Sequence, residues 1–207
     1  MTQREKQAAK SKNIIYKATI RCLDKYGYAK TSTSLITQEA GISRGALTHH
    51  FSSKEDLIVE TTNKILGPTV NPPRKPPPNK EPSSKEDELS AIKGDLIRLW
   101  KRVVNTEEGH ALLEILVAFR TDEKLRKRIK PDLVLWNTRM QTSILQNYTL
   151  TDGDDKRFER VWQVARVFYR GLITQDAFLE DPGELDMIIE EFVNILAPMM
   201  QRRDHED

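Results

Sequence analysis

The run from Ser43 to His49 carries side chains that could read the edges of DNA bases. Arg44 can donate a pair of hydrogen bonds to guanine, and Ala46 can contact the methyl group of thymine. Gly45 lets the backbone come close to the bases. We therefore expect a DNA-binding face made of Ser32, Thr33, Ser34, Ser43, Arg44, Gly45, Ala46, Thr48, His49, His50 and Lys54.

Part of this set suits phosphate rather than bases. Ser32, Thr33 and Ser34 would begin a helix, where exposed amides and hydroxyls can hold a phosphate. Lys54 would lie in the first turn of a later helix, where its charge opposes the helix dipole, so a bound phosphate explains its position better than helix stability does. The alternative is an ordinary solvated surface.

A helix-turn-helix must position these residues, and the segment from Thr31 to Leu57 has its pattern. A helix from about Ser32 ends at Gly41, which tolerates the left-handed backbone of a sharp turn. Ser43 can cap a second short helix that ends near Phe51. The N-terminal residues of that second helix contact bases in such motifs.

Further helices should flank the motif on both sides. The preceding helix would end at Gly27, and its single cysteine, Cys22, is expected to be a buried small hydrophobe. The following helix opens at Ser52 with a capping box. The inward-facing residues are expected to be Ile14, Ile15, Ala18, Cys22, Leu23 and Tyr26 in the first of these helices, and Leu57, Ile58 and Ile65 in the second.

Helical periodicity beyond residue 85 predicts an all-α fold, with a three-helix head, a larger helical body and no strands. A long helix is expected from a cap at Thr121, kinked at Pro131, and the last helix opens at Asp181 with Pro182 in its first position. Seven prolines between residues 67 and 82 indicate a loop or linker. The predicted domains are residues 1–66 (DNA binding), 67–84 (proline-rich linker) and 85–207 (effector binding and dimerisation).

Two sets of mostly apolar residues in the body can each be interpreted in two ways. The first could line an effector pocket for an apolar or aromatic molecule, with two polar residues as handles, or could be plain core. The second could form a self-association face or could equally be core. The effector set is Trp100, His110, Glu114, Leu116, Phe119, Trp136, Met140, Trp162 and Phe168. The dimerisation set is Phe158, Trp162, Ala165, Tyr169, Ile173, Leu185, Ile188, Ile189, Phe192 and Leu196.

Charge and motifs narrow the function classes. Residues 1–66 hold eleven Lys or Arg against six Asp or Glu, although the whole chain has a net charge of only +2. The basic end therefore coincides with the DNA-binding pattern. No apolar run is long enough to span a membrane, and the N-terminus lacks a signal-peptide core, so we expect a cytoplasmic protein. His49 and His50 lack further ligands for a metal, and no catalytic or cofactor motif occurs, so we expect no enzyme, cofactor or metal.

The head resembles the N-terminal domain of the tetracycline-repressor (TetR) family over roughly residues 10–66. The resemblance implies a DNA-binding head, a divergent helical ligand-binding body and a homodimer formed chiefly by the last two helices. The chain departs from the family pattern at Thr48, usually Tyr, and at Thr37, usually Ala; the Thr37 hydroxyl is expected to bond a backbone carbonyl. The matching residues are Gly27-Tyr28, Thr31-Ser32, Ile36, Ala40-Gly41-Ile42-Ser43, Gly45, Leu47, His50-Phe51, Lys54-Glu55 and Leu57.

The leading hypothesis is a homodimeric repressor that releases a palindromic operator in double-stranded DNA when it binds a small molecule. An alternative keeps DNA binding but has no small-molecule effector, so that the protein is an architectural or partner-controlled regulator. In that case the proline-rich segment would be a contact surface.

Overall fold

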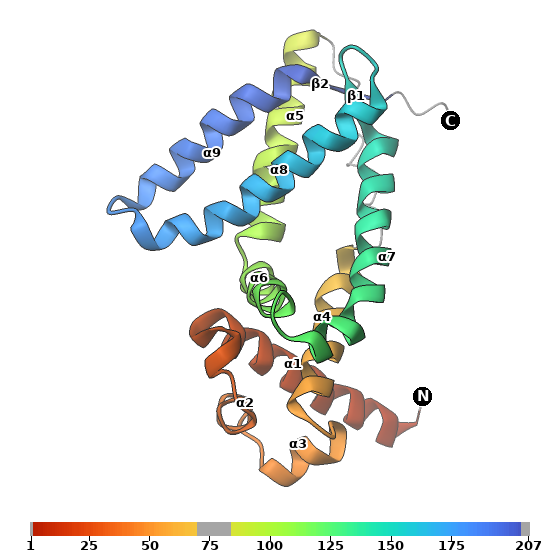
Figure 1. Ribbon diagram of the computed structural model, residues 1–207, viewed down its shortest axis with the longest axis vertical. Coiled ribbons are helices and arrows are strands. Elements are labelled where there is room, and N and C mark those ends of the chain that lie inside the picture. Colours follow the sequence, from red (N-terminus) through yellow and green to blue (C-terminus); the bar gives the residue numbers. More distant parts are fainter. Residues whose placement is uncertain (1, 70–83, 204–207) are drawn as a thin grey trace. The chain divides into compact units, whose positions relative to one another are not determined.

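The computed structural model describes residues 2–69 and 84–203. Over these residues the predicted all-α class is confirmed, with nine α-helices and one small sheet (Figure 1). None of the described helices is long and apolar enough to cross a membrane. The helices are α1 (Gln3–Lys30), α2 (Thr33–Ala40), α3 (Arg44–His50), α4 (Lys54–Thr69), α5 (Lys85–Leu99), α6 (Glu107–Phe119), α7 (Glu123–Asn147), α8 (Asp155–Gln175) and α9 (Pro182–Leu196).

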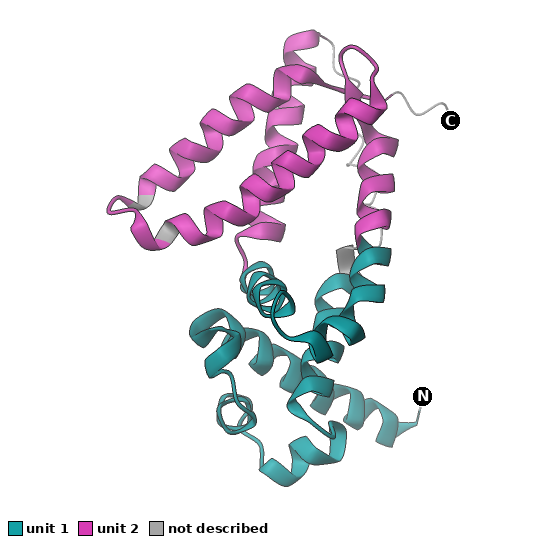
Figure 2. Ribbon diagram, viewed as in Figure 1, with its two compact units in different colours: residues 1–69, 107–136 teal, residues 70–106, 137–207 magenta. Residues whose placement is uncertain are grey.

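The chain forms two compact units (Figure 2). Unit 1 contains residues 1–69 and 107–136, and unit 2 contains residues 70–106 and 137–207. Unit 1 thus includes α6 and the first part of α7 in addition to the predicted head. Of the predicted linker, Gly67 to Thr69 belong to α4, and residues 70–83 lie outside the described residues. The functional division at residues 66 and 85 stays a prediction.

Unit 1 has two apolar clusters. One joins α1 to the helix-turn-helix through residues such as Ile15, Ile36 and Leu47, and it includes Cys22, which is buried as predicted. The other joins α1 and α4 to α6 and α7 through residues such as Leu23 and Ile115. Two predicted core residues of α1 are instead exposed, Ile14 (40%) and Tyr26 (37%), because the buried stripe of α1 is narrower than its apolar pattern.

The core of unit 2 lies among α5, α8 and α9. A π-helical turn (Trp100–Val104) extends α5 and buries the Trp100 indole, whose ring stacks on Tyr169 with centroids 6.2 Å apart. The Tyr169 hydroxyl donates a hydrogen bond to the Leu96 carbonyl at 3.1 Å. A buried tyrosine with a satisfied hydroxyl fixes one orientation of α8 against α5.

Two local predictions in the body are wrong and one is confirmed. Residues Tyr148–Leu150 (β1) and Met200–Arg202 (β2) form an antiparallel pair, although no strand was expected. The cap of α7 is Asp122 rather than Thr121, because the Asp122 carboxylate accepts a hydrogen bond from the Leu125 amide at 2.9 Å. At α9 the Asp181 carboxylate accepts from the Gly183 amide at 2.8 Å, which confirms the predicted cap.

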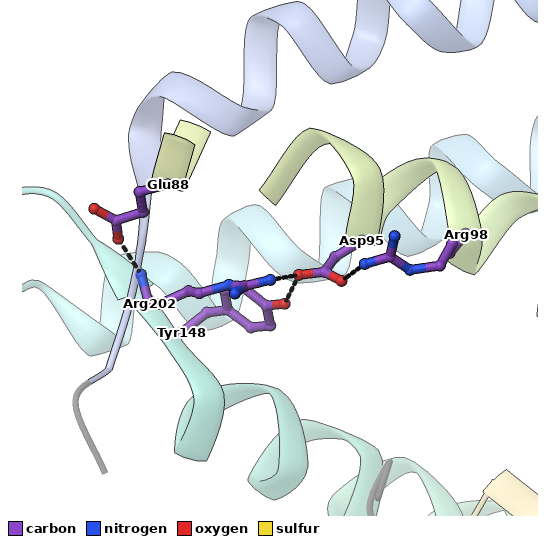
Figure 3. Close-up of polar contacts among 5 residues, drawn as sticks. All are labelled: Glu88, Asp95, Arg98, Tyr148 and Arg202. Carbon is purple, nitrogen blue, oxygen red and sulfur yellow. Dashed lines mark hydrogen bonds and ion pairs between the residues drawn. The ribbon is translucent and has the colours of Figure 1, made fainter. Parts of the chain in front are cut away.

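A polar network attaches this small sheet to α5 (Figure 3). Asp95 accepts a hydrogen bond from the Tyr148 hydroxyl at 2.7 Å and forms ion pairs with Arg202 and Arg98. The Arg202 amide also donates to Glu88 at 2.9 Å. Burial raises the pKa of Asp95, but these donors outweigh it, so the pKa of this carboxyl lies below its ordinary value.

We expect Asp95→Asn to lower the free energy of unfolding by about 2 to 3 kcal/mol at neutral pH, because it leaves Arg202 half-buried without its charge partner. Since the folded-state pKa of Asp95 is depressed, its contribution is complete above its unfolded pKa and is lost as the pH falls through the folded value. Urea unfolding at several pH values measures this difference.

The control for this experiment is Asp186→Asn. Asp186 pairs with Lys101 at 3.7 Å, and both side chains are more than half exposed, so its loss should cost at most about 1 kcal/mol. Equal losses for the two variants would contradict the role assigned to Asp95.

Candidate DNA-binding interface

The turn between α2 and α3 has the geometry that the sequence predicted. The Ser32 hydroxyl accepts a hydrogen bond from the Leu35 amide at 3.2 Å, and the Ser43 hydroxyl accepts from the Ala46 amide at 3.1 Å. Gly41 lies between the helices with a left-handed backbone (φ 64°, ψ 34°). Both helix starts and the reversal between them are therefore fixed by local hydrogen bonds and one glycine.

The N-terminal half of α3 presents the predicted reading residues to solvent. Arg44, Gly45 and Ala46 are exposed, whereas Leu47 is 2% exposed and packs inward. An exposed guanidinium beside two small residues is the arrangement that suits contact with base edges in a major groove.

The other predicted contact residues of the helix-turn-helix lie around these three. Ser43 and His49 are exposed, and His50 is half-buried. Thr48 is exposed, and its hydroxyl donates to the Arg44 and Gly45 carbonyls at 3.2 and 3.1 Å, so it supports the first turn of α3. The Thr37 hydroxyl donates to the Ser34 carbonyl at 2.9 Å, as predicted.

The two histidines contact each other at right angles. Their rings have centroids 5.2 Å apart with planes at 78°, and His50 also lies against Phe51. Over the described residues, no group of three His, Cys, Asp or Glu is placed to hold a metal ion.

Lys54 has an internal partner that sequence reasoning missed. Its ammonium donates to the Tyr28 carbonyl at 3.1 Å and lies 4.6 Å from the centre of the Tyr28 ring. Burial lowers the pKa of Lys54, although the charge of Asp122 works in the other direction. These contacts explain a lysine at the start of α4 without DNA, so its contact with phosphate remains a prediction.

Tyr28 connects the end of α1 to α6 and to the start of α7 through hydrogen bonds. Gly27 breaks the helical backbone (φ 72°, ψ 170°), and the next amide, that of Tyr28, donates to the Glu114 carboxylate on α6 at 2.9 Å. The Tyr28 hydroxyl donates to Asp122 at 3.4 Å. The predicted helix end at Gly27 is therefore present as a break, after which a short helical stretch continues to Lys30.

A second polar cluster joins α4 to α7. The Asp56 carboxylate accepts hydrogen bonds from Ser52, from Ser53 at 2.8 Å and from Arg128 at 2.5 Å. These donors lower the pKa of Asp56 to about 2. The cap expected at Ser52 lies one residue later, because the Ser53 hydroxyl accepts a hydrogen bond from the Asp56 amide at 3.0 Å.

The predicted effector residues fall into both units. His110 and Glu114, the two polar handles, lie in unit 1, where His110 contacts Asp24 at 2.7 Å and Glu114 binds the Tyr28 amide. Leu116, Phe119 and Trp136 also belong to unit 1. The members in unit 2 are Trp100, Met140, Trp162 and Phe168. The structure therefore gives the two polar handles intramolecular partners, and effector binding by this set stays a prediction.

Most of the predicted dimerisation residues lie in the core of their own chain. Seven are buried there: Phe158, Trp162, Ala165, Tyr169, Leu185, Ile189 and Leu196. Ile173, Ile188 and Phe192 are partly buried against the same core. The exposed apolar residues of α8 and α9 are different ones, namely Val164 (66%), Val167 (68%), Met187 (60%) and Ile195 (62%). Periodicity located the apolar side of each helix, and these four residues stand on the opposite side.

Residues 15–61 match the sequence model of a family described as bacterial regulatory proteins, tetR family. The chain is 42% identical over 52 residues to the helix-turn-helix transcriptional regulator BetI of Vibrio campbellii, covering 25% of this chain and 26% of that protein. It is 28% identical over 119 residues to an uncharacterised helix-turn-helix regulator of Mycobacterium bovis, covering 56% of each chain. The chain thus spans about a quarter of the first relative and about half of the second.

The fold extends the similarity beyond the head. A transcriptional regulator from Saccharomonospora viridis, solved in complex with choline, superposes with a TM-score of 0.59 over 90% of this chain and 95% of that one, at 15% identity. At this identity the comparison establishes a shared fold.

Two glycines offer a matched test of the local geometry. Gly41 has open space around it, so Gly41→Ala should cost only the left-handed backbone energy, about 1 to 2 kcal/mol. Gly27→Ala should cost more, because its backbone region is almost restricted to glycine and an added Cβ would lie 2.9 Å from a Glu114 carboxylate oxygen. Thermal unfolding of both variants measures the difference, and a smaller loss for Gly27→Ala would contradict the tight contact with Glu114.

Proposed function

We propose that the chain is a transcriptional regulator of the TetR family, whose sequence model matches residues 15–61, and that it binds double-stranded DNA through α3. The observation that carries this proposal is the capped α2–turn–α3 unit, which presents Arg44, Gly45 and Ala46 to solvent. The basic composition of residues 1–66 supports it, because phosphate attraction supplies much of the affinity of such proteins for DNA.

We further propose that the protein acts as a homodimer on a palindromic operator, with recognition helices about 34 to 36 Å apart. The exposed valines and the exposed Met187 and Ile195 on α8 and α9 support a self-complementary face. Charge supports it as well, because Arg160 is exposed on α8 while α9 exposes a group of acidic residues. These acidic residues are Glu184, Glu190 and Glu191. A two-fold axis that set α8 against the partner's α9 would bring opposite charges together.

Repression relieved by a small molecule is the form of regulation that we propose. The choline complex of the Saccharomonospora viridis protein supports the capacity of this fold to hold a small molecule. A molecule that favours the DNA-incompetent state must lose affinity when operator DNA is bound, because the coupling between the two sites is reciprocal.

The competing proposal is a partner-controlled or architectural regulator without an effector. A panel of metabolites that shifts neither the melting temperature of the protein nor its affinity for the operator would favour this proposal.

The DNA-binding proposal predicts a sequence-dependent role for Arg44. Arg44→Ala should weaken binding to the preferred duplex by about 1 to 3 kcal/mol and relax the preference at one base pair, because a bidentate contact to guanine is lost. The measurement is fluorescence anisotropy on a duplex selected from a random pool, with random duplex as reference. A wild-type protein without salt-sensitive preference for the selected duplex would overturn the proposal.

The matched variant for phosphate contact is Lys54→Met, which keeps the aliphatic stem over Tyr28. If Lys54 also reaches phosphate, affinity should fall for all duplexes alike and the salt slope should drop by about one unit. A loss of thermal stability with an unchanged salt slope would assign Lys54 to the internal contact alone.

The dimer proposal predicts that Val167→Glu yields monomers. A charge at an exposed apolar position should have little effect on the fold but prevent burial of this face against a second copy. Sedimentation should therefore give about 24 kDa for the variant against about twice that mass for the wild type. Val134→Glu, at another exposed valine (55%), is the control and should remain dimeric; a monomeric wild type would overturn the proposal.

A further inference from the structure

Two arginines of α8 lie one helical turn apart and are both half-buried. Arg166 donates a hydrogen bond to the Asn137 side-chain oxygen on α7. Burial, and then the charge of Arg170, lower the pKa of Arg166 to about 10, and burial also lowers the pKa of Arg170. Two cations are thus held close together in a partly dehydrated environment, where each raises the cost of the other's charge.

Arg170 makes no hydrogen bond or ion pair with the described part of the chain. The same helix carries a second donor without a partner among the described residues, the indole nitrogen of Trp162, whose side chain is only 3% exposed. Trp162, Arg166 and Arg170 follow one another at four-residue spacing, so they occupy neighbouring turns on adjoining sides of α8. All three supply donors, and none supplies an acceptor.

Unit 2 also shows how a structural arginine is accommodated. Arg202 is likewise half-buried, but Asp95 and Tyr148 surround it, and these partners outweigh burial and raise its pKa (Figure 3). Arg170 lacks such a partner among the described residues. A desolvated charge that packing does not need is expected where a ligand supplies the missing partner.

We propose that Arg166 and Arg170 bind the carboxylate of a small organic acid, with the Trp162 indole as an additional donor. A guanidinium matches a carboxylate with two parallel hydrogen bonds, which makes arginine suited to this group. The adjoining positions on α8 are Tyr169 and Ile173, so the remainder of the ligand is apolar. This inference rests on the proposed function in that the acid would be the effector, but acid binding itself can be measured without DNA.

The experiment uses the full chain, with octanoate and benzoate as probes and the matched neutral amides, octanamide and benzamide, as controls. Isothermal titration calorimetry should show saturable binding of at least one carboxylate, at least about tenfold tighter than its amide, because only the acid carries a charge opposite to that of the guanidinium groups. Inorganic phosphate is a separate arm, and it should bind more weakly than the carboxylate because it lacks the apolar body. Tighter binding of phosphate, equal binding of the amides, or no carboxylate binding at millimolar concentration would overturn the proposal.

Variants separate a ligand site from a structural role. Arg170→Gln should lower carboxylate affinity about tenfold or more, and it should raise the melting temperature of the ligand-free protein by about 2 to 4 °C, because it removes a desolvated charge. Arg166→Gln should also lower affinity. Arg139→Gln, at an exposed arginine of α7 that takes no part in either proposal, should change neither quantity. A fall in melting temperature with unchanged affinity for Arg170→Gln would assign the residue to packing and overturn the proposal.

The outcomes also separate this inference from the regulator proposal. If carboxylate binding depends on Arg170 but the protein shows no preference for any DNA sequence, the carboxylate site is supported and only the regulator proposal is rejected. Sequence-specific DNA binding in a protein that binds neither carboxylate would sustain the regulator and reject only the site.

Discussion

The break of α1 at Gly27 imposes the constraint on which unit 1 depends. A positive φ interrupts the helical ladder, and the Tyr28 amide then needs an acceptor from elsewhere, because an unsatisfied polar group inside a fold is costly. The acceptor is Glu114, 86 residues later in the chain. Lys54 binds the carbonyl of the same residue. Helix α6 therefore supplies a hydrogen-bond acceptor that α1 needs. Hydrogen bonding as well as apolar packing holds the head and α6 together in one compact unit.

The hydrogen bonds within unit 1 define positions that apolar packing alone would leave adjustable. Apolar burial is roughly proportional to area and has little directional preference, whereas polar contacts such as Asp24–His110 and Asp56–Arg128 require particular side chains to face each other. Each of these pairs joins a helix of the head, α1 or α4, to α6 or α7. If α6 or α7 changed position, these contacts would have to break, or α1 or α4 would have to move with it.

Several features whose physical cause is local could be predicted from the sequence. The caps expected at Ser43 and Asp181 are present, whereas those expected at Ser52 and Thr121 lie one residue later, at Ser53 and Asp122. Features that depend on distant partners were not predictable in this way: β1 pairs with a strand some fifty residues later, and Lys54 binds Tyr28. Periodicity identified the apolar sides of α8 and α9 but could not tell which side another chain would cover. The sequence did contain a sign of the arginine pair, since two cations four residues apart interrupt the apolar stripe of α8.

Helix α7 gives the two proposals a common element. It contributes Arg128 to the contacts around Asp56 in unit 1 and Asn137 to the contact with Arg166 in unit 2. A carboxylate that bound Arg166 would compete with Asn137 for the same guanidinium donors, so acid binding and the α7–α8 contact cannot be independent. By reciprocity, any preference of operator DNA for one arrangement of α7 would appear as a change in acid affinity. The charge of Arg170, which has no partner among the described residues, would then be retained despite its cost to stability, because it makes α8 responsive to an acid.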